Sequence, residues 1–576
     1  MQLPYSISSP RRRQRLAALC LAPSLAAWPV VPALGQSLPN AGSLLQQMER
    51  SVEPRLPPRV DKPRVAPLPE EMTAAPGLAV EVKQFRFAGN TLLSDARLAG
   101  AVAPWRGRAL NFTELRHAAA AVAEAYRAAG WIVRAYLPRQ DITDGIVTIQ
   151  IVEAVFGAAR VDSPTPLRLK LDRVLSYIDA VQKKGEPLSA AALDRALLLI
   201  EDVPGTRVAG SLAPGAAQGE TDLVLKLSTT PVFTGDVALD NAGGRSTGAA
   251  RITGNLAINS PLAFGEQFTA TGIHSEGIEF LRLGATLPVG AHGWRVGANG
   301  SALRYRLVAP EFSALDARGT STTAGLEASY PLIRARLANL FLNLSADRKQ
   351  FENISVGAIT THYTTNAVTA ALQGNRFDNW GGGGANAGLI SVASGHVNLN
   401  GSPNQAADAA TTRVQGNYQK LRYVASRRQV LAEDVQLVAA ISGQVASKNL
   451  DSAEKFYLGG PNGVRAYPLN EAGGSNGTLV NLEARKNLPL NLALSGFFDW
   501  GRVTVNRNND FVGAATVNQI TLKGAGISLG WSGHGANLRG VWAHRIGDNP
   551  NPTAAGFDQD GSKVRNRFWI TAGFSF

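Results

Sequence analysis

A serine between two glycines is the first feature of this chain that could carry covalent chemistry. Ser246 lies between Gly244 and Gly248 in a G-x-S-x-G pattern. Such a serine acts as a nucleophile when it occupies a sharp strand-to-helix turn and has a histidine partner. The residues on both sides alternate as strands do, so the pattern predicts a hairpin loop and no nucleophile.

Metal and nucleotide chemistry lack their usual spacings as well. The seven histidines are scattered, and none belongs to H-E-x-x-H or another metal-binding pattern. No G-x-x-x-x-G-K-[ST] phosphate loop occurs. The single cysteine, Cys20, lies in an apolar N-terminal run, so the rest of the chain has no thiol chemistry. The sequence therefore predicts that the protein is not an enzyme and holds no metal or cofactor.

A charged pair is the remaining candidate. Arg465 lies in a glycine-dense run, residues 458–468, and Asp499 lies on a later segment that alternates as a strand. If the glycine-rich loop folds into a confined interior, an unpaired arginine there would be costly. Alternation along residues 492–501 places Asp499 on the face opposite Trp500, where it can accept from the arginine. An ordinary surface loop is the alternative.

The segment that must position this pair, residues 231–576, has only strand and turn patterns. In residues 568–576 apolar side chains alternate with polar or small ones, and the chain ends on Phe576. The alternation recurs in segments such as 251–259 and 281–287, and it is typical of a barrel whose outer face meets lipid. The length of this segment predicts about 16 strands. A pair of soluble β-sandwiches, the alternative, would not explain the aromatic end.

The N-terminus has the pattern of an export signal. Four arginines precede a largely apolar stretch, and small residues precede Gln36. We therefore expect residues 1–36 to be a cleaved signal peptide; prolines in the stretch disfavour a membrane anchor, the alternative. Its removal lowers the net charge from +13 to +9. We attribute that charge to basic loops and a polar lumen rather than to a nucleic-acid surface.

Between the signal and the strands, the sequence predicts a short helix, a linker and two similar units. The helix is expected within residues 37–53, with Ser43 as its cap, and prolines make residues 54–77 an extended linker. Residues 78–154 and 155–230 each have the order strand, helix, helix, strand, strand, and the alternation of residues 80–87 predicts that they form the first strand of the first unit. Small sheets with open edges bind extended chains by adding a strand, so we expect both units to bind a partner. Inert spacers are the alternative.

Two short motifs and the last residue are informative together. The first motif is Gly463, Val464, Arg465, Ala466 and Tyr467, the second is Phe497-x-Asp499-x-Gly501, and the chain ends on Phe576. With these, and over essentially its full length, the sequence resembles the two-partner secretion transporters, the TpsB class of the Omp85 superfamily. The first motif resembles the family's V-R-G-Y at the tip of the sixth extracellular loop, the second its F-x-D-x-G on the barrel wall, and Phe576 the terminal signal read by the barrel-assembly machinery. Ala466 stands where the family usually has glycine, and it would be strained if that position required a positive φ.

The resemblance implies a membrane all-β barrel of about 16 antiparallel strands with two periplasmic α+β POTRA domains and an N-terminal plug helix. The protein would lie in the bacterial outer membrane and export a partner protein, with Arg465 paired to Asp499 inside the lumen. Its expected partners are a secreted TpsA-like protein, outer membrane lipid and the barrel-assembly machinery, with no nucleic acid, and the chain is expected to be a monomer. The alternatives are an Omp85-type assembly factor and a passive porin.

Overall fold

The computed structural model describes residues 39–51, 79–142, 144–163, 169–217 and 219–576. The expected signal peptide, residues 1–36, and the expected proline-rich linker, residues 54–77, lie outside these residues. None of the described helices is long and apolar enough to cross a membrane.

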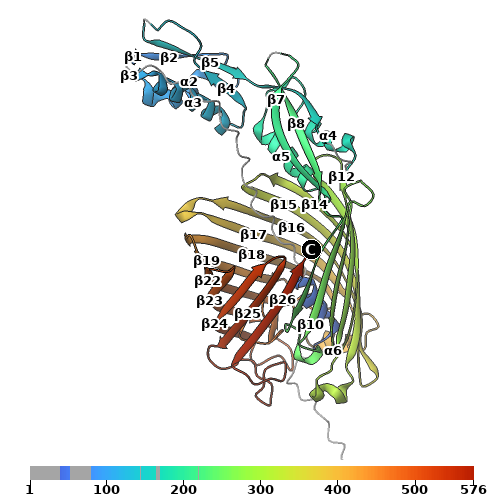
Figure 1. The fold of residues 1–576 in the computed structure, drawn as a ribbon. Helices are drawn as coiled ribbons and strands as arrows, with labels where there is room; N and C mark the ends of the chain where they lie inside the picture. Colours follow the sequence, from blue (N-terminus) through green and yellow to red (C-terminus); the bar gives the residue numbers. More distant parts are fainter. Residues whose placement is uncertain (1–38, 52–78, 143, 164–168, 218) are drawn as a thin grey trace, which may run out of the picture. The chain divides into compact units, whose positions relative to one another are not determined.

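Sixteen antiparallel strands close into a barrel, which confirms the predicted fold class (Figure 1). Each strand pairs with its neighbours, and the last strand pairs back onto the first. The strands are β9 (Phe233–Asp240), β10 (Arg251–Asn259), β11 (Gln267–Ser275), β12 (Ile278–Val289), β13 (Trp294–Arg306), β14 (Arg318–Arg334), β15 (Ala338–Ser355), β16 (Ala358–Asp378), β17 (Gly384–Asn398), β18 (Gly416–Ala432), β19 (Val435–Ala446), β22 (Asn476–Leu488), β23 (Leu492–Thr504), β24 (Gln519–Gly533), β25 (Ala536–Arg545) and β26 (Asn566–Ser575).

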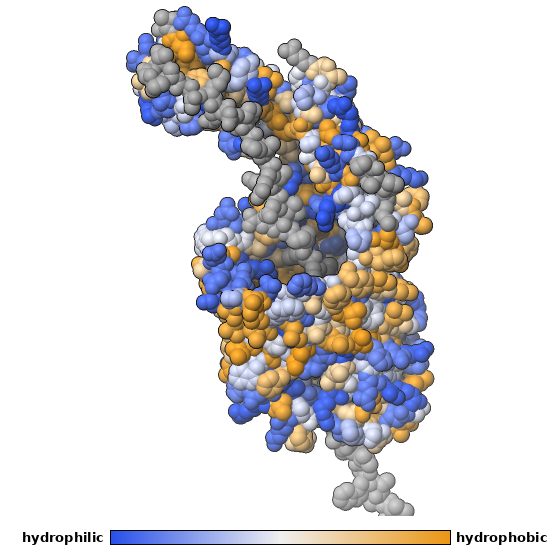
Figure 2. Space-filling model, viewed as in Figure 1, coloured by the Kyte–Doolittle hydropathy of each residue, from blue (hydrophilic) through white to orange (hydrophobic). Residues whose placement is uncertain are grey.

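The alternation predicted for the last strand is present in the barrel wall. Phe568 and Ile570 are 63% and 56% exposed, whereas Trp569 between them is 7% exposed. Hydrophobic residues accordingly gather on the outer surface of the barrel strands (Figure 2). Because side chains alternate across a strand, the same residues that coat the outside leave every second position for the lumen.

The seam where β26 meets β9 is short. Only five residue pairs are in register there, Thr571–Ser575 opposite Asp236–Asp240. Beyond them the side chain of Asn241 continues the ladder: its amide donates to Phe568 O at 2.9 Å and its carbonyl accepts from Ile570 N at 2.8 Å. The side-chain amide thus adds two hydrogen bonds at this end of the seam, beside the main-chain bond from Asn241 N to Ile570 O at 3.3 Å.

The first α+β unit contains β1 (Ala79–Val82), β2 (Gln84–Ala88), α2 (Asp95–Val102), β3 (Arg108–Asn111), α3 (Phe112–Ala128), β4 (Val133–Tyr136) and β5 (Ile146–Glu153). Sequence alternation suggested one strand over 80–87, and this is wrong. The chain turns at Lys83, whose amide and that of Gln84 both donate to Gly145 O. As a result β1 pairs with β3, whereas β2 pairs in parallel with β5.

The second unit has the same order of main elements, as the internal repeat suggested. It consists of β6 (Val155–Val161), α4 (Leu171–Asp179), α5 (Ala190–Glu201), β7 (Thr206–Pro214) and β8 (Glu220–Thr229), in the sheet order β6-β8-β7. Buried apolar residues of both helices pack against the sheet. Two ion pairs join this unit to the β14–β15 turn: Asp202 with Arg334 at 2.7 Å and Asp194 with Arg336 at 2.8 Å.

The N-terminal helix, α1 (Ala41–Ser51), is enclosed by the barrel and is dark blue in Figure 1. The helix begins at Ala41, so Ser43 lies in its first turn and is not the cap that was expected. Asn40 caps it instead: its side chain accepts from Ser43 N at 3.0 Å, while the Ser43 hydroxyl accepts from Asn40 N at 3.2 Å. This reciprocal arrangement satisfies amides that the first turn leaves without helical partners.

Candidate functional site

The connection between β19 and β22, residues 447–475, folds back against the inner wall of the barrel; we call it the lumen loop. It contains a small antiparallel ladder, β20 (Phe456–Leu458) with β21 (Ala472–Gly474), which presents the tip between the two strands. At the tip Val464 and Ala466 are fully buried, and they belong to an apolar cluster with wall residues that include Phe497 and Trp569. Packing on the wall therefore defines the conformation of the loop.

The structure brings Arg465 and Asp499 together in a bidentate pair. Arg465 Nε donates to Asp499 Oδ2 at 2.9 Å, and Arg465 Nη2 donates to Asp499 Oδ1 at 2.8 Å. The Arg465 main-chain N–H adds a third bond to Oδ2 at 3.0 Å. Both residues are buried, and a buried charged pair of this kind is strongly destabilised when either partner is removed.

Three further wall residues complete the arginine site: Phe497, which belongs to the predicted wall motif, and Glu483 and Asn481, which the sequence did not single out. Glu483 on β22 accepts from Arg465 Nη1 at 2.9 Å. Asn481, two residues earlier on the same face, donates to Asp499 Oδ1 at 2.7 Å and to Gly463 O at 3.2 Å. The Arg465 guanidinium lies over the Phe497 ring, 3.4 Å from its centroid. Alternation along β22 could have indicated Asn481 and Glu483, since both lie on its inner face.

The closing strand of the barrel also holds the loop tip. Trp569 Nε1 on β26 donates to Arg465 O at 2.8 Å. The alternation of residues 568–576 predicted that Trp569 faces away from the lipid side, but only the tertiary structure shows its partner. The tip is therefore bonded to β22, β23 and β26 at once.

The glycines of the two motifs are explained by close packing. A Cβ on Gly501 would lie 2.6 Å from a Leu458 methyl group of the lumen loop. The φ angle of Ala466 is not positive, so alanine is not strained at this position. Its methyl group faces Gly524, where an added Cβ would come within 2.6 Å. The wall thus leaves room for alanine at this position.

Helix α1 lies against a different part of the wall. Leu44, Leu45 and Met48 are buried and join an apolar cluster with wall residues that include Tyr305 and Phe351. At its N-terminal end, Ala41 N donates to Asn353 Oδ1 at 2.8 Å. The helix therefore fills part of the barrel interior with its apolar face on the wall.

Ionic and polar contacts of α1 are few. Lys349 Nζ donates to Glu49 Oε2 at 2.7 Å, and Arg282 lies 4.0 Å from the same carboxylate. Gln46 donates to the Lys455 carbonyl of the lumen loop. Two buried amide atoms of the helix, Gln46 Oε1 and Gln47 Nε2, have no hydrogen-bond partner among the described residues.

The remaining candidates take the following places. Phe576 is exposed on the outer face, and its main chain exchanges two 3.0 Å hydrogen bonds with Gly235 of β9. Ser246 is buried in a single 3₁₀ turn, η2 (Arg245–Thr247), within the loop that joins β9 to β10, so the predicted loop between two strands is confirmed. Within the described ranges no three histidine, cysteine, aspartate or glutamate side chains are grouped to hold a metal ion.

Two family models match the chain. The model described as haemolysin secretion/activation protein ShlB/FhaC/HecB matches residues 219–533, and the ShlB-type POTRA domain matches residues 80–154. The first match covers more than half of the chain.

Individual proteins agree with these matches. The heme/hemopexin transporter protein HuxB of Haemophilus influenzae strain 86-028NP is 24% identical over 94% of this chain and 95% of its own length. Among solved structures, CdiB from Escherichia coli has a TM-score of 0.67 at 19% identity, covering 94% of this chain and all of its own. BamA from Haemophilus ducreyi lacking POTRA domains 1–3 has a TM-score of 0.53 at 15% identity, covering 86% and 100%. At these identities the solved structures show the fold alone.

Proposed function

This chain belongs to the ShlB/FhaC/HecB family of haemolysin secretion/activation proteins, and from that premise we propose how it exports a partner protein. It is an outer membrane translocator of two-partner secretion, with its POTRA domains in the periplasm. We assign residues 78–154 and 155–230 to the two POTRA domains and 231–576 to the barrel. The assembly-factor alternative is less well supported, because the matched family model and the curated relatives are secretion proteins and transporters.

The partner is a secreted TpsA-like protein, and the POTRA domains take up its unfolded chain. Support comes from the sheet order β6-β8-β7, which leaves β7 at an edge, and from the exposed residues 209–212 along that strand. An extended chain can add to such an edge through main-chain hydrogen bonds. HuxB is named a heme/hemopexin transporter protein and CdiB an outer membrane transporter, and both names fit a role in the export of a partner.

Inside the barrel, α1 and the lumen loop both occupy space that the exported chain needs. We assign α1 the role of a plug that leaves during export, and the lumen loop the role of a fixed element held by Arg465 and Asp499. The single observation that carries the plug is the burial of Leu44, Leu45 and Met48 against the inner wall of a closed barrel. The protein acts as a monomer, contacts outer membrane lipid through its apolar outer face, and is inserted by machinery that recognises Phe576.

Liposome swelling tests the plug. The protein without its signal should admit small sugars slowly, and a variant lacking residues 37–76 should admit them much faster. A variant lacking only residues 54–77 separates the helix from the linker, because it keeps α1. Equal swelling rates for the full-length and the helix-free proteins would remove the plug from this proposal while leaving the export function to be tested by secretion.

A further inference from the structure

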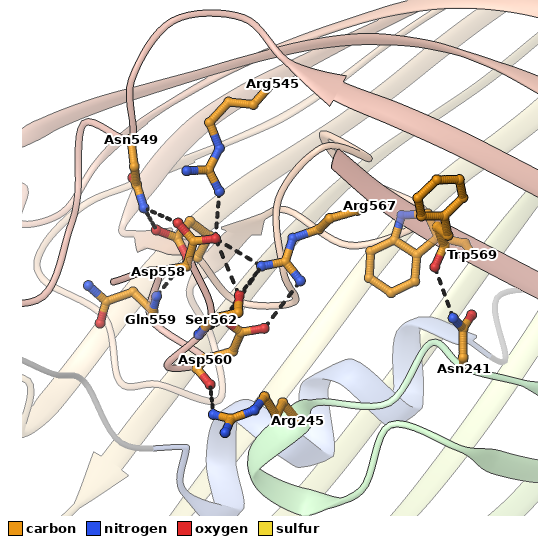
Figure 3. Close-up of polar contacts among 12 residues, drawn as sticks. Asn241, Arg245, Arg545, Asn549, Asp558, Gln559, Asp560, Ser562, Arg567 and Trp569 are labelled. Carbon is orange, nitrogen blue, oxygen red and sulfur yellow. Dashed lines mark hydrogen bonds and ion pairs between the residues drawn. The ribbon is translucent and has the colours of Figure 1, made fainter. Parts of the chain in front are cut away.

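The loop between β25 and β26, residues 546–565, is fastened to the ends of both strands; we call it the clamp loop (Figure 3). Asp558 lies at its centre and is buried. Its Oδ2 accepts from Arg545 Nη2 of β25 at 2.6 Å and from Arg567 Nη2 of β26 at 2.9 Å. Two charge-assisted bonds to one buried carboxylate fix the loop more firmly than neutral contacts would.

The clamp loop also binds the lumen loop just beyond its motif. Glu471 is fully buried; its Oε2 accepts from Gln559 N at 2.9 Å, and its Oε1 accepts from Asn549 Nδ2 at 2.5 Å. The Asn551 amide donates to Glu471 O at 2.8 Å. In addition, Arg545 lies over the ring of Tyr467, 4.4 Å from its centroid.

A third contact reaches the other side of the barrel seam. Arg245, in the loop that follows β9, donates to Asp560 O of the clamp loop at 3.0 Å (Figure 3). It also bonds to Glu311 in the loop between β13 and β14. The clamp loop therefore contacts the lumen loop, the closing strand β26 and the loop that follows β9.

We propose that the clamp loop is a second positioning element for the lumen loop, with Glu471 and Asp558 as its positioning residues. The inference rests on the proposed function, since it concerns how the loop that carries Arg465 is kept in place during export. In this arrangement Asp499 on the barrel wall binds the tip through Arg465, and the clamp loop binds the segment after Tyr467 through Glu471. The buried Glu471 carboxyl is satisfied by donors that the clamp loop alone supplies, so displacement of either loop leaves it without them.

The test measures the position of the lumen loop directly. In a Cys20→Ala background the chain has no other cysteine. Spin labels at Asn462→Cys, an exposed residue just before the buried tip, and at Leu490→Cys, on the exposed β22–β23 turn, report one distance between loop and wall. Asp558→Asn and Glu471→Gln are the test variants in the full chain reconstituted in liposomes, and Arg465→Ala is the reference for a displaced tip.

Asp548→Ala is the matched control. Asp548 is also an ion-paired acid of the clamp loop, but it is 89% exposed and its partner Arg565 is 61% exposed. An exposed pair of this kind contributes little to stability, so the control should keep the parent distance. A heat-dependent gel shift confirms for each variant that the barrel has folded.

We expect Asp558→Asn to increase the displaced population on the order of tenfold or more, with a smaller increase for Glu471→Gln. The inference is overturned if Arg465→Ala displaces the label and both test variants keep the parent distance. Secretion of the partner is measured separately. If the test variants displace the loop and secretion stays normal, the role of the lumen loop in export fails while the positioning role of the clamp loop stands.

Discussion

Helix α1 and the lumen loop both lie inside the barrel, yet they are held by different kinds of contact. The helix presents an apolar face, Leu44, Leu45 and Met48, and forms one close ionic contact with the wall, from Glu49 to Lys349. The Arg465 guanidinium of the lumen loop makes four contacts. It donates two hydrogen bonds to Asp499 and one to Glu483, and it lies over the Phe497 ring.

The difference lies in what separation from the wall would cost. Moving α1 exposes apolar surface and breaks the ion pairs of Glu49 and the hydrogen bonds of Ala41 and Gln46. Two of its buried amide atoms have no hydrogen-bond partner among the described residues. Moving the lumen loop leaves Asp499 buried and uncompensated, which is a far larger cost. Two segments that both lie inside the barrel can therefore differ in the free energy needed to leave the wall. A plug requires a low cost of leaving, and a fixed loop requires a high one.

The largest effect is expected from Arg465→Ala. It leaves Asp499 as an unpaired buried charge and should destabilise the loop–wall contact by about 3–5 kcal/mol. Secretion of the partner should fall to near background at normal protein levels, as measured by immunoblot of the medium. Arg502→Ala, an exposed arginine of β23, is the control and should secrete normally. Normal secretion by the Arg465 variant would show that the lumen loop is held no more firmly than α1 needs to be, and would contradict the difference between them.

A smaller effect should come from Lys349→Met, which removes the close ionic contact of α1. Loss of a charge-assisted hydrogen bond should weaken plug binding by about 1.5–3 kcal/mol. Open-channel events in planar bilayers should become on the order of tenfold more frequent. Arg348→Met, its exposed neighbour on the outer face, should leave the channel closed as often as in the parent. An unchanged opening frequency in the Lys349 variant would show that the apolar face alone holds the helix.

Raising the pH should loosen the lumen loop at its clamp-loop contact. Burial, with a smaller contribution from Asp558, raises the pKa of Glu471 to about 8, while donors from Gln559 and Asn549 and the charge of Arg545 oppose the shift. When the loop is in place, the Glu471 carboxyl is buried and keeps its proton up to about pH 8; when the loop is displaced, the exposed carboxyl loses its proton near pH 4.5. The contact therefore weakens as the pH rises from 4.5 through about 8.

Between pH 7 and 9 this loss is on the order of 1 kcal/mol. The spin-label distance at the loop tip should then show a growing second population, and Glu471→Gln should abolish the pH dependence. A pH dependence that persists in the glutamine variant would assign it to another group.

The smallest effect is expected from Trp569→Phe, which keeps the ring but removes the N–H that donates to Arg465 O. One neutral hydrogen bond contributes about 1 kcal/mol, so secretion should fall only a few-fold and recover at lower temperature. Trp542→Phe, on the outer face of β25, should have no effect on secretion. A loss as large as that of Arg465→Ala would show that the closing strand, rather than Asp499, dominates the loop site.

Local pattern was sufficient for much of the fold. Period-two alternation in residues 568–576 predicted which side chains face lipid, because successive side chains of a strand point to opposite faces of the sheet. It failed at residues 80–87, where the chain turns at Lys83 because main-chain bonds to Gly145 divide one apparent strand between two sheets. The repeat of strand, helix, helix, strand, strand was visible because each copy carries its own apolar periodicity.

By itself, the sequence determined the barrel, the tandem units, the enclosed-helix candidate and the two residues that could form a charged pair. Only the tertiary structure decided that Glu483, Asn481 and Trp569 share the Arg465 site, that Asn40 caps α1, and that Glu471 is satisfied by a loop about 80 residues away. The physical reason is that alternation is a property of each strand alone, whereas the partners of a buried polar group depend on which distant segments the closed barrel brings together.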